Sequence, residues 1–218
     1  MSAEQGPVVV RIPNGQFVQN CYLVADPATR EAVMVDPGEE AERFLAELAR
    51  RGWTLTAVWL THAHVDHVLG VQAVKDATGV PVHLHPADRP IYDALPQFGA
   101  WVGRPLAVPP APDGELAHGQ RVRVGAYEFE VRHAPGHSPG SVAFVGHGRV
   151  FAGDVLFAGS VGRTDLPGGD PATLLRSIRE QLLSLPDATI VHSGHGPDTT
   201  IGTERTTNPF LTGAYGLG

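Results

Sequence analysis

The 218-residue sequence predicts an α/β or α+β layered fold. Short apolar runs typical of strands alternate with stretches whose apolar residues recur at helical spacing, and one pair of runs has the pattern of a hairpin. Hydrophobic residues make up 42% of the chain and charged residues 18%, a composition that excludes a disordered protein. Because one domain typically spans roughly 100–200 residues, we expect a single domain over residues 1–218.

The first third of the chain is expected to form strands and one helix. The apolar runs predict strands at Val8–Ile12, Tyr22–Val24, Ala32–Asp36 and Leu55–Leu60. Between the last two, Glu39–Arg50 has an acidic start, a basic end and an apolar face, and Gly52 follows it. That arrangement is typical of a helix whose terminal charges match its dipole.

The middle of the chain continues the alternation. We expect a helix at Val68–Thr78, a short strand at Val82–Leu84 and a helix at Ala87–Trp101 that breaks near Pro96. The segment Arg104–Gly114 is rich in proline, which favours an extended surface loop. A linker between two domains is the alternative interpretation of this segment.

The second half is expected to begin with a hairpin. The predicted elements are a hairpin of Arg121–Val124 and Tyr127–Arg132, strands at Val142–Val145, Val150–Ala152 and Thr189–His192, and a helix at Pro171–Leu185. The tail from Thr203 is short, and we expect the glycine-rich sequence at its end to be frayed.

Charge and cysteine content exclude several classes of function. The net charge is −7, and the basic residues include only one lysine and form no cluster, which disfavours nucleic-acid binding. The single cysteine, Cys21, lies in an apolar run and is expected to be a buried core residue, so neither an intrachain disulfide nor a multi-thiolate zinc site can form. No signal peptide or run of 18 apolar residues is visible, so we expect a cytoplasmic protein without membrane contact. We expect this protein to be a monomer or a homodimer.

Three of the 11 histidines lie in one short motif, His62-Ala63-His64-Val65-Asp66-His67. The motif follows a predicted strand and precedes a predicted helix. Alternate residues of an extended loop point the same way, so His62 and His64 can share one metal ion, while Asp66 and His67 can face a second. A solvated polar loop is the alternative.

Later residues supply further ligands at comparable places. His137 lies in a tight turn after a strand, Asp154 ends a strand, and His195 follows the last strand between two glycines. Loops that follow strands can converge on one edge of a sheet. Five histidines and two aspartates suffice for two ions if one carboxylate is shared, and Asp154 is the natural bridge. Two ions about 3.5–4 Å apart can activate water between them and polarise a carbonyl.

The order and spacing of these seven residues resemble the signature of the metallo-β-lactamase superfamily. The resemblance implies a four-layer αββα sandwich of two mixed sheets, with the metals in a groove at one edge. It implies that one ion is bound by His62, His64 and His137, and that the other is bound by Asp66, His67 and His195. Asp154 would bridge them. Two Zn²⁺ ions are expected, with iron or manganese as alternatives.

Within that superfamily the chain resembles glyoxalase II, a hydroxyacylglutathione hydrolase. The similar segments are 159–170, which reads Gly-Ser-Val-Gly-Arg-Thr-Asp-Leu-Pro-Gly-Gly-Asp, and Asn208-Pro209-Phe210-Leu211. The resemblance implies hydrolysis of S-lactoylglutathione or a related thioester by a metal-bridging hydroxide, with Asp66 and Asp154 as catalytic residues. It also implies that Arg163 meets a carboxylate of the thiol carrier, although pairing with Asp165 or Asp170 is an equal alternative.

Only about twenty residues follow His195, so we expect no counterpart of the helical extension that helps full-length glyoxalase II to bind glutathione. The resemblance therefore covers the metal chemistry and leaves the thiol carrier open.

Several other functions stay open at this point. A persulfide dioxygenase would hold one iron on His62, His137 and Asp154. A lactonase, a phosphodiesterase and a metal-binding scaffold without catalysis are further alternatives. β-Lactam hydrolysis is disfavoured, because zinc β-lactamases do not normally use an aspartate at the position of Asp154.

The remaining histidines are assigned simpler roles. His83 and His85 are expected to be structural, and His118 and His147 are expected to lie in exposed turns. His133 and His192, at strand ends near ligands, are candidates for orienting the ligands.

Overall fold

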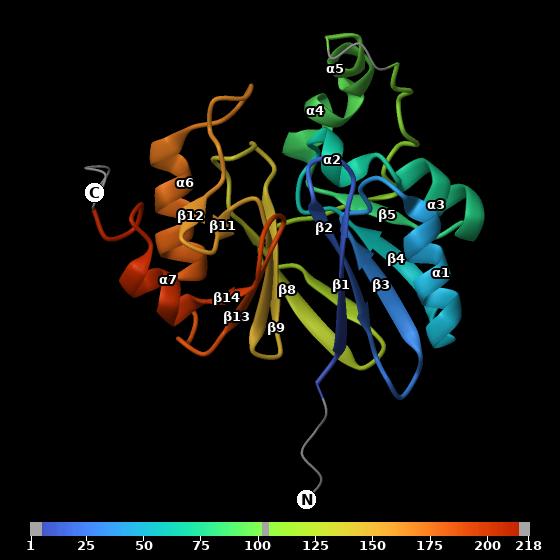
Figure 1. Ribbon diagram of the computed structural model, residues 1–218, viewed down its shortest axis with the longest axis horizontal. Coiled ribbons are helices and arrows are strands. Elements are labelled where there is room, and N and C mark those ends of the chain that lie inside the picture. The colour runs from blue at the N-terminus through green and yellow to red at the C-terminus, as the bar shows by residue number, and fades with distance from the viewer. Residues whose placement is uncertain (1–5, 102–104, 214–218) are drawn as a thin grey trace, which may run out of the picture.

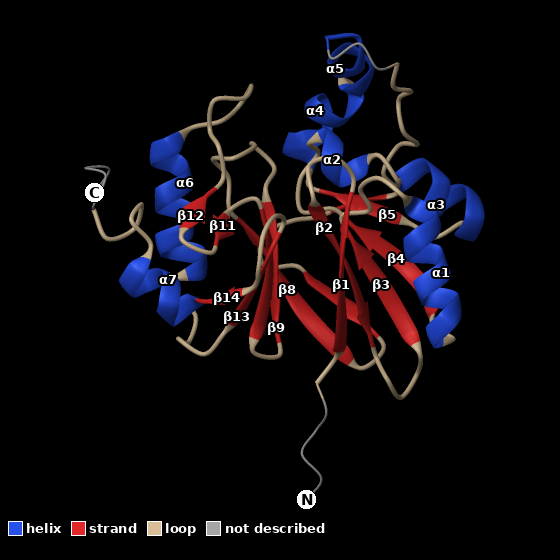
Figure 2. Cartoon of the chain, in the orientation of Figure 1, coloured by secondary structure: helices blue, strands red, loops and turns tan. Residues whose placement is uncertain are grey.

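A computed structural model describes residues 6–101 and 105–213 of the protein. Two six-stranded sheets face each other, with helices on both outer sides (Figures 1 and 2). The first sheet has the order β1 (Val8–Asn14), β2 (Gln19–Ala25), β3 (Glu31–Val35), β4 (Thr54–Trp59), β5 (Val82–Leu84) and β6 (Gly114–Glu115). The second has the order β14 (Thr199–Thr200), β13 (Ile190–Ser193), β10 (Arg149–Gly153), β9 (Val142–Gly146), β8 (Tyr127–His133) and β7 (Arg121–Val124).

Both sheets are mixed. In the first, β3, β4, β5 and β6 pair in parallel, and in the second, β10 pairs in parallel with β13. The outer helices and turns are α1 (Ala41–Arg51), α2 (Val65–Val68), α3 (Val71–Thr78), η1 (Pro86–Asp88), α4 (Arg89–Asp93), α5 (Leu95–Trp101), α6 (Pro171–Ser177), η2 (Ile178–Leu182) and α7 (Ile201–Thr207). A small hairpin of β11 (Leu156–Phe157) and β12 (Ser160–Val161) lies beside the second sheet. This architecture confirms the expected αββα sandwich of two mixed sheets.

Three apolar clusters separate the four layers. One lies between the first sheet and its helices, with Phe44 and Leu48 of α1 against it. A second fills the space between the sheets and is rich in aromatic rings, which include Trp59 and Phe144 at 5.1 Å between centroids. A third lies between the second sheet and α6. Because β2 is covered on both faces, all seven of its residues are buried, including Cys21 as expected.

Most predicted strands are confirmed, and the differences concern the helices. The helix expected at Val68–Thr78 begins only at Val71, and Val68 ends the separate turn α2; between them, a Cβ at Gly70 would lie 2.5 Å from the carbonyl oxygen of Gly38. The expected helix at Glu39–Arg50 begins only at Ala41, because Glu40 has a φ of 63°. The helix predicted at Ala87–Trp101 consists of η1, α4 and α5, since prolines interrupt it.

The helix α7, at the start of the tail, was not predicted from the sequence. Thr200 accepts a hydrogen bond from the backbone N–H of Thr203 and so caps α7. Asn208 is fully buried and donates to the carbonyl of Ser160. The glycine-rich end beyond residue 213 and Arg104 in the proline-rich segment lie outside the described residues. None of the described helices is long and apolar enough to cross a bilayer.

The layer between the sheets predicts a large loss of stability for Phe144→Ala. Phe144 is fully buried against Trp59, and removal of its ring should lower the free energy of unfolding by about 3–5 kcal/mol. Phe17→Ala is the control, because Phe17 is 51% exposed and its loss should cost less than about 0.5 kcal/mol. Urea unfolding checks both variants, and similar losses in the two would contradict this account of the core.

Candidate metal centre

All seven predicted ligands meet at one edge of the sandwich. They follow β4, β8, β10 and β13, so the first sheet supplies the 62–67 motif and the second sheet supplies His137, Asp154 and His195. Six of the seven form two groups in which one ligand atom of each residue lies within 4.8 Å of the others. The first group is His62, His64 and His137, and the second group is Asp66, His67 and His195.

The first group is built from ring nitrogens alone. Nε2 of His137 lies 2.7 Å from Nδ1 of His64 and 3.1 Å from Nε2 of His62. Burial, followed by the neighbouring rings, lowers the pKa of His62 and lowers that of His64 to about 3. The imidazoles are therefore neutral near pH 7, which is the form that binds metal.

The second group combines two rings with a carboxylate. Oδ2 of Asp66 lies 3.1 Å from Nε2 of His195 and 3.7 Å from Nε2 of His67. His195 is 28% exposed at its side chain and Asp66 is 17% exposed, whereas His62 and His137 are almost completely buried. Solvent therefore reaches the centre from the side of the second group.

Asp154 lies between the two groups. Its Oδ1 is 3.3 Å from Nε2 of His67, and its Oδ2 is 3.6 Å from Nε2 of both His137 and His195. Burial raises the pKa of Asp154, but the imidazoles of His67 and His137 outweigh burial, so its pKa lies well below the usual range. An ionised carboxylate in this position can serve both groups.

These residues fit a pair of divalent cations. Nε2 of His67 and Oδ1 of Asp154 are buried and have no hydrogen-bond partner, an arrangement that is costly unless another group satisfies them. The two atoms lie 3.3 Å from each other. A set of imidazole nitrogens and carboxylate oxygens suits zinc, iron or manganese.

Asp36 orients two of the ligands, a role that sequence reasoning missed. Its Oδ2 accepts hydrogen bonds from Nδ1 of His67 at 2.9 Å and from the hydroxyl of Thr61 at 2.6 Å. The Thr61 oxygen in turn lies 3.0 Å from Nδ1 of His62. Asp36 is also within reach of the ligand atoms of His62 and His67, but its oxygens are engaged in these bonds and in one from the backbone N–H of Thr61. The signal in the sequence was a carboxylate at a strand end, the same placement as Asp154.

Backbone carbonyls orient two further ligands. Nδ1 of His137 donates to the carbonyl of Arg163 at 2.8 Å, and Nδ1 of His195 donates to the carbonyl of Phe17 at 3.1 Å. With Nδ1 engaged, Nε2 carries the lone pair that faces the centre.

The guanidinium of Arg163 pairs with Asp165 through two bonds of 2.7 Å, and its side chain is 61% exposed. Asp170 instead caps α6 by accepting from the backbone N–H of Thr173. Contact between Arg163 and a substrate carboxylate stays a prediction.

The other histidines lie outside the two groups. His133 lies 2.8 Å from the carbonyl of Pro139, within the turn that carries His137, and stacks on His85. His192 is buried against Phe151 and lies 3.2 Å from Asp198, and among the described residues it belongs to none of the groups that could hold a metal ion. His118 and His147 are exposed as expected, and Nδ1 of His83 is buried without a hydrogen-bond partner.

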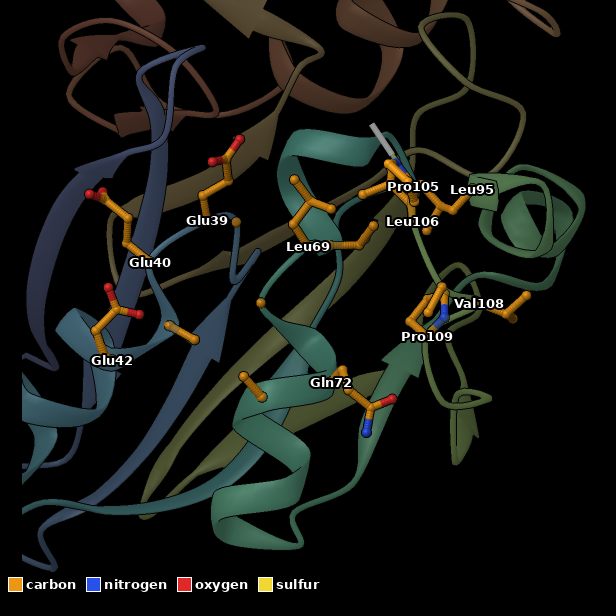
Figure 3. Close-up of a pocket in the computed structure, with 16 residues that line it drawn as sticks. Glu39, Glu40, Glu42, Leu69, Gln72, Leu95, Pro105, Leu106, Val108 and Pro109 are labelled. Atoms are coloured by element: carbon orange, nitrogen blue, oxygen red, sulfur yellow. The ribbon is translucent and has the colours of Figure 1, made fainter. Parts of the chain in front are cut away.

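A groove of about 400 Å³ lies along α2 and α3. Figure 3 shows Glu39, Glu40 and Glu42 on one side of it and Leu95 and Leu106 on the other. None of the seven predicted ligands lines this groove. The groove is therefore separate from the metal centre.

The contacts of Asp36 predict weaker metal binding in Asp36→Asn. Asparagine tolerates the φ of 52° at this position, but its amide cannot accept all the bonds that come from Thr61 and His67. Zinc affinity should fall about 10–100-fold, as measured by competition with a chromophoric chelator. Asp165→Asn, at an exposed carboxylate, is the control and should match the wild type. Equal affinities in all three proteins would remove the orienting role of Asp36.

Comparison with known proteins agrees with this geometry. The chain is 40% identical over 204 residues to the hydroxyacylglutathione hydrolase GloC of Haemophilus influenzae, with 92% of this chain and 96% of GloC covered. Two similar crystal structures are the BLEG-1 B3 metallo-β-lactamase and TTHA1623 in a di-iron-bound form. BLEG-1 is 44% identical with a TM-score of 0.89, over 94% of this chain and 100% of its own. TTHA1623 is 46% identical with a TM-score of 0.85, over 93% and 100% of the two chains.

The family model described as Metallo-beta-lactamase superfamily matches residues 14–195, a range that contains all seven predicted ligands. The αββα sandwich and the two groups of ligands at its edge agree with that match. The chain therefore belongs to the metallo-β-lactamase superfamily.

Proposed function

We propose that the protein is a metal-dependent hydrolase that cleaves a hydroxyacyl thioester, such as S-lactoylglutathione or a related thiol ester. The observation that carries the proposal is the position of Asp154, whose two oxygens face His67 of one group and His137 of the other. That arrangement suits two cations held by seven side chains. The 40% identity to GloC supports the choice of a thioester.

The chain provides separate ligands for the two ions. His62, His64 and His137 would hold one, Asp66, His67 and His195 would hold the other, and Asp154 would contact both. Bound divalent ions, most simply Zn²⁺, supply an electrophile for the thioester carbonyl and activate water at neutral pH. Asp66 is partly exposed beside His195 and would accept a hydrogen bond from the attacking water and orient it.

The thiol carrier would approach over the exposed side of the centre. Arg163 is held next to the first group because its own carbonyl binds His137, and its guanidinium is 61% exposed. We propose that a carboxylate of the carrier displaces Asp165 from this guanidinium, since an exposed pair of this kind contributes little stability. The single buried Cys21 is compatible with a reducing cytoplasm, where such a substrate would be met.

Two similar structures favour specific second candidates. The likeness to BLEG-1 favours β-lactam hydrolysis, although an aspartate at position 154 argues against it. The di-iron form of TTHA1623 shows that a similar protein binds iron, which keeps an iron-dependent persulfide dioxygenase as an alternative. A chromogenic cephalosporin tests the first of these reactions, and oxygen uptake with glutathione persulfide tests the second.

The first experiment combines elemental analysis of the purified protein with hydrolysis of S-lactoylglutathione. We expect about two divalent ions per chain and thioester turnover that is lost on chelation and restored by metal. One iron per chain, with oxygen uptake and no hydrolysis, would overturn the proposal in favour of the dioxygenase.

The bridging position of Asp154 predicts that Asp154→Ala loses most of the hydrolase activity, by at least about 100-fold, and retains less metal. The loss should follow because both groups lose one carboxylate at once. Asp165→Ala is the control for metal content, since this carboxylate is exposed and pairs only with Arg163 among its described contacts. Full activity with full metal content in Asp154→Ala would rule out a shared bridge.

A further inference from the structure

A second buried carboxylate, Asp88, lies beneath the metal centre and belongs to neither group of ligands. It ends the short turn η1 that follows β5, and it is 0% exposed. Nothing in the sequence pattern singled it out. Its position raises the question of which groups compensate a carboxylate without access to water.

The two oxygens of Asp88 connect the two loops that carry the first group. Oδ2 accepts from the backbone N–H of Ala63 at 2.9 Å and from the hydroxyl of Ser138 at 2.8 Å. Oδ1 accepts from the backbone N–H of Gly140 at 2.6 Å. Ala63 stands between His62 and His64, and Ser138 directly follows His137. One side chain therefore holds all three ligands of the first group through their immediate neighbours.

The turn after His137 is shaped around Asp88. A Cβ at Gly140 would lie 2.6 Å from the backbone nitrogen of Asp88, so only glycine permits this approach. The hydroxyl of Ser141 lies 2.7 Å from that of Ser138 and accepts from the backbone N–H of Ser138. The contact is thus a closed network in which each buried donor has an acceptor.

The two loops depend on this network because they come from different sheets. The motif with His62 and His64 follows β4 of the first sheet, whereas His137 follows β8 of the second. The ring nitrogens of the two loops must nevertheless lie about 3 Å apart to share one ion, and they do so at 2.7 and 3.1 Å. Val142 adds one backbone bond to the carbonyl of Thr61, beside the same junction.

We propose that Asp88 is a positioning residue that sets the distance between the loops of the first group and so tunes its affinity for metal. It contacts neither ion nor substrate and acts through Ala63, Ser138 and Gly140. This inference deepens the proposed function and rests on the two-ion centre, but it does not depend on which substrate is cleaved.

Asp26 offers a matched control, because it follows the end of β2 that lies away from the metal centre. It is 1% exposed and accepts from three backbone N–H groups, those of Ala28, Thr29 and Ala126. It also joins the two sheets, and Gly125 packs against it as Gly140 packs against Asp88. Since β2 is seven residues long, the two ends of the strand are about 20 Å apart. Asp26 therefore has the same structural role without a neighbouring ligand.

The test compares zinc binding of metal-free Asp88→Asn, Asp26→Asn and wild-type protein, by titration against a chromophoric chelator, together with urea unfolding. In Asp88→Asn the amide nitrogen would face the backbone N–H of either Ala63 or Gly140, and two donors cannot bond to each other, so the loops should separate. We expect both variants to lose stability. The affinity for zinc should fall about 10–100-fold in Asp88→Asn alone. Equal zinc affinity in all three proteins would overturn the proposal, because Asp88 would then be merely structural.

Ser138→Ala keeps the proposal testable if Asp88→Asn fails to fold. It removes one of the three contacts and leaves the carboxylate in place, so a smaller loss of zinc affinity is expected, and wild-type affinity would count against the proposal. Wild-type protein that binds two zinc ions without cleaving the thioester would overturn the proposed substrate but not the role of Asp88, since the titration measures binding and needs no turnover.

Discussion

The packing of the two sheets against each other is the constraint on which the metal centre depends. Neither sheet holds the whole first group of candidate ligands by itself, because His62 and His64 come from one sheet and His137 from the other. Ring-to-ring contacts between the sheets, such as that of Trp59 with Phe144, fix their separation. Protein interiors are close-packed and resist deformation, so apolar contacts farther down the sandwich can maintain spacings of about 3 Å between the ligand atoms.

Charge in the centre is balanced in layers. The imidazoles of His62 and His64 are kept neutral by burial, whereas the carboxylate of Asp154 is kept ionised by the rings around it. Asp36 and Asp88 then occupy the layer behind the ligands, where each accepts several hydrogen bonds. Asp36 restricts the ring of His67 to one tautomer and one direction, and Asp88 fixes the loops that carry the first group, so less entropy is lost on binding metal.

The clustering of the seven candidate ligands could be predicted because they stand at strand ends in a pattern of histidine and aspartate that is typical of a metal site. Asp36 and Asp88 were missed, since a single aspartate before a proline or in a short turn is also a common turn residue. What distinguishes them is three-dimensional: each reaches residues at least 25 positions away in the chain. The helical tail was missed for a similar reason, because its stability comes from the Thr200 cap and from Asn208 buried under the β12 turn.

The division of ligands along the chain also orders events during synthesis. A growing polypeptide has all three residues of the first group once position 137 has emerged, whereas the second group lacks a member until His195 emerges near the end. His195 is then joined to the start of the chain, since Asn20 bonds to the carbonyl of Gly194 and Gln19 pairs with His195 itself. The centre therefore closes last, when the beginning and the end of the protein meet, and a truncated nascent chain cannot assemble both groups.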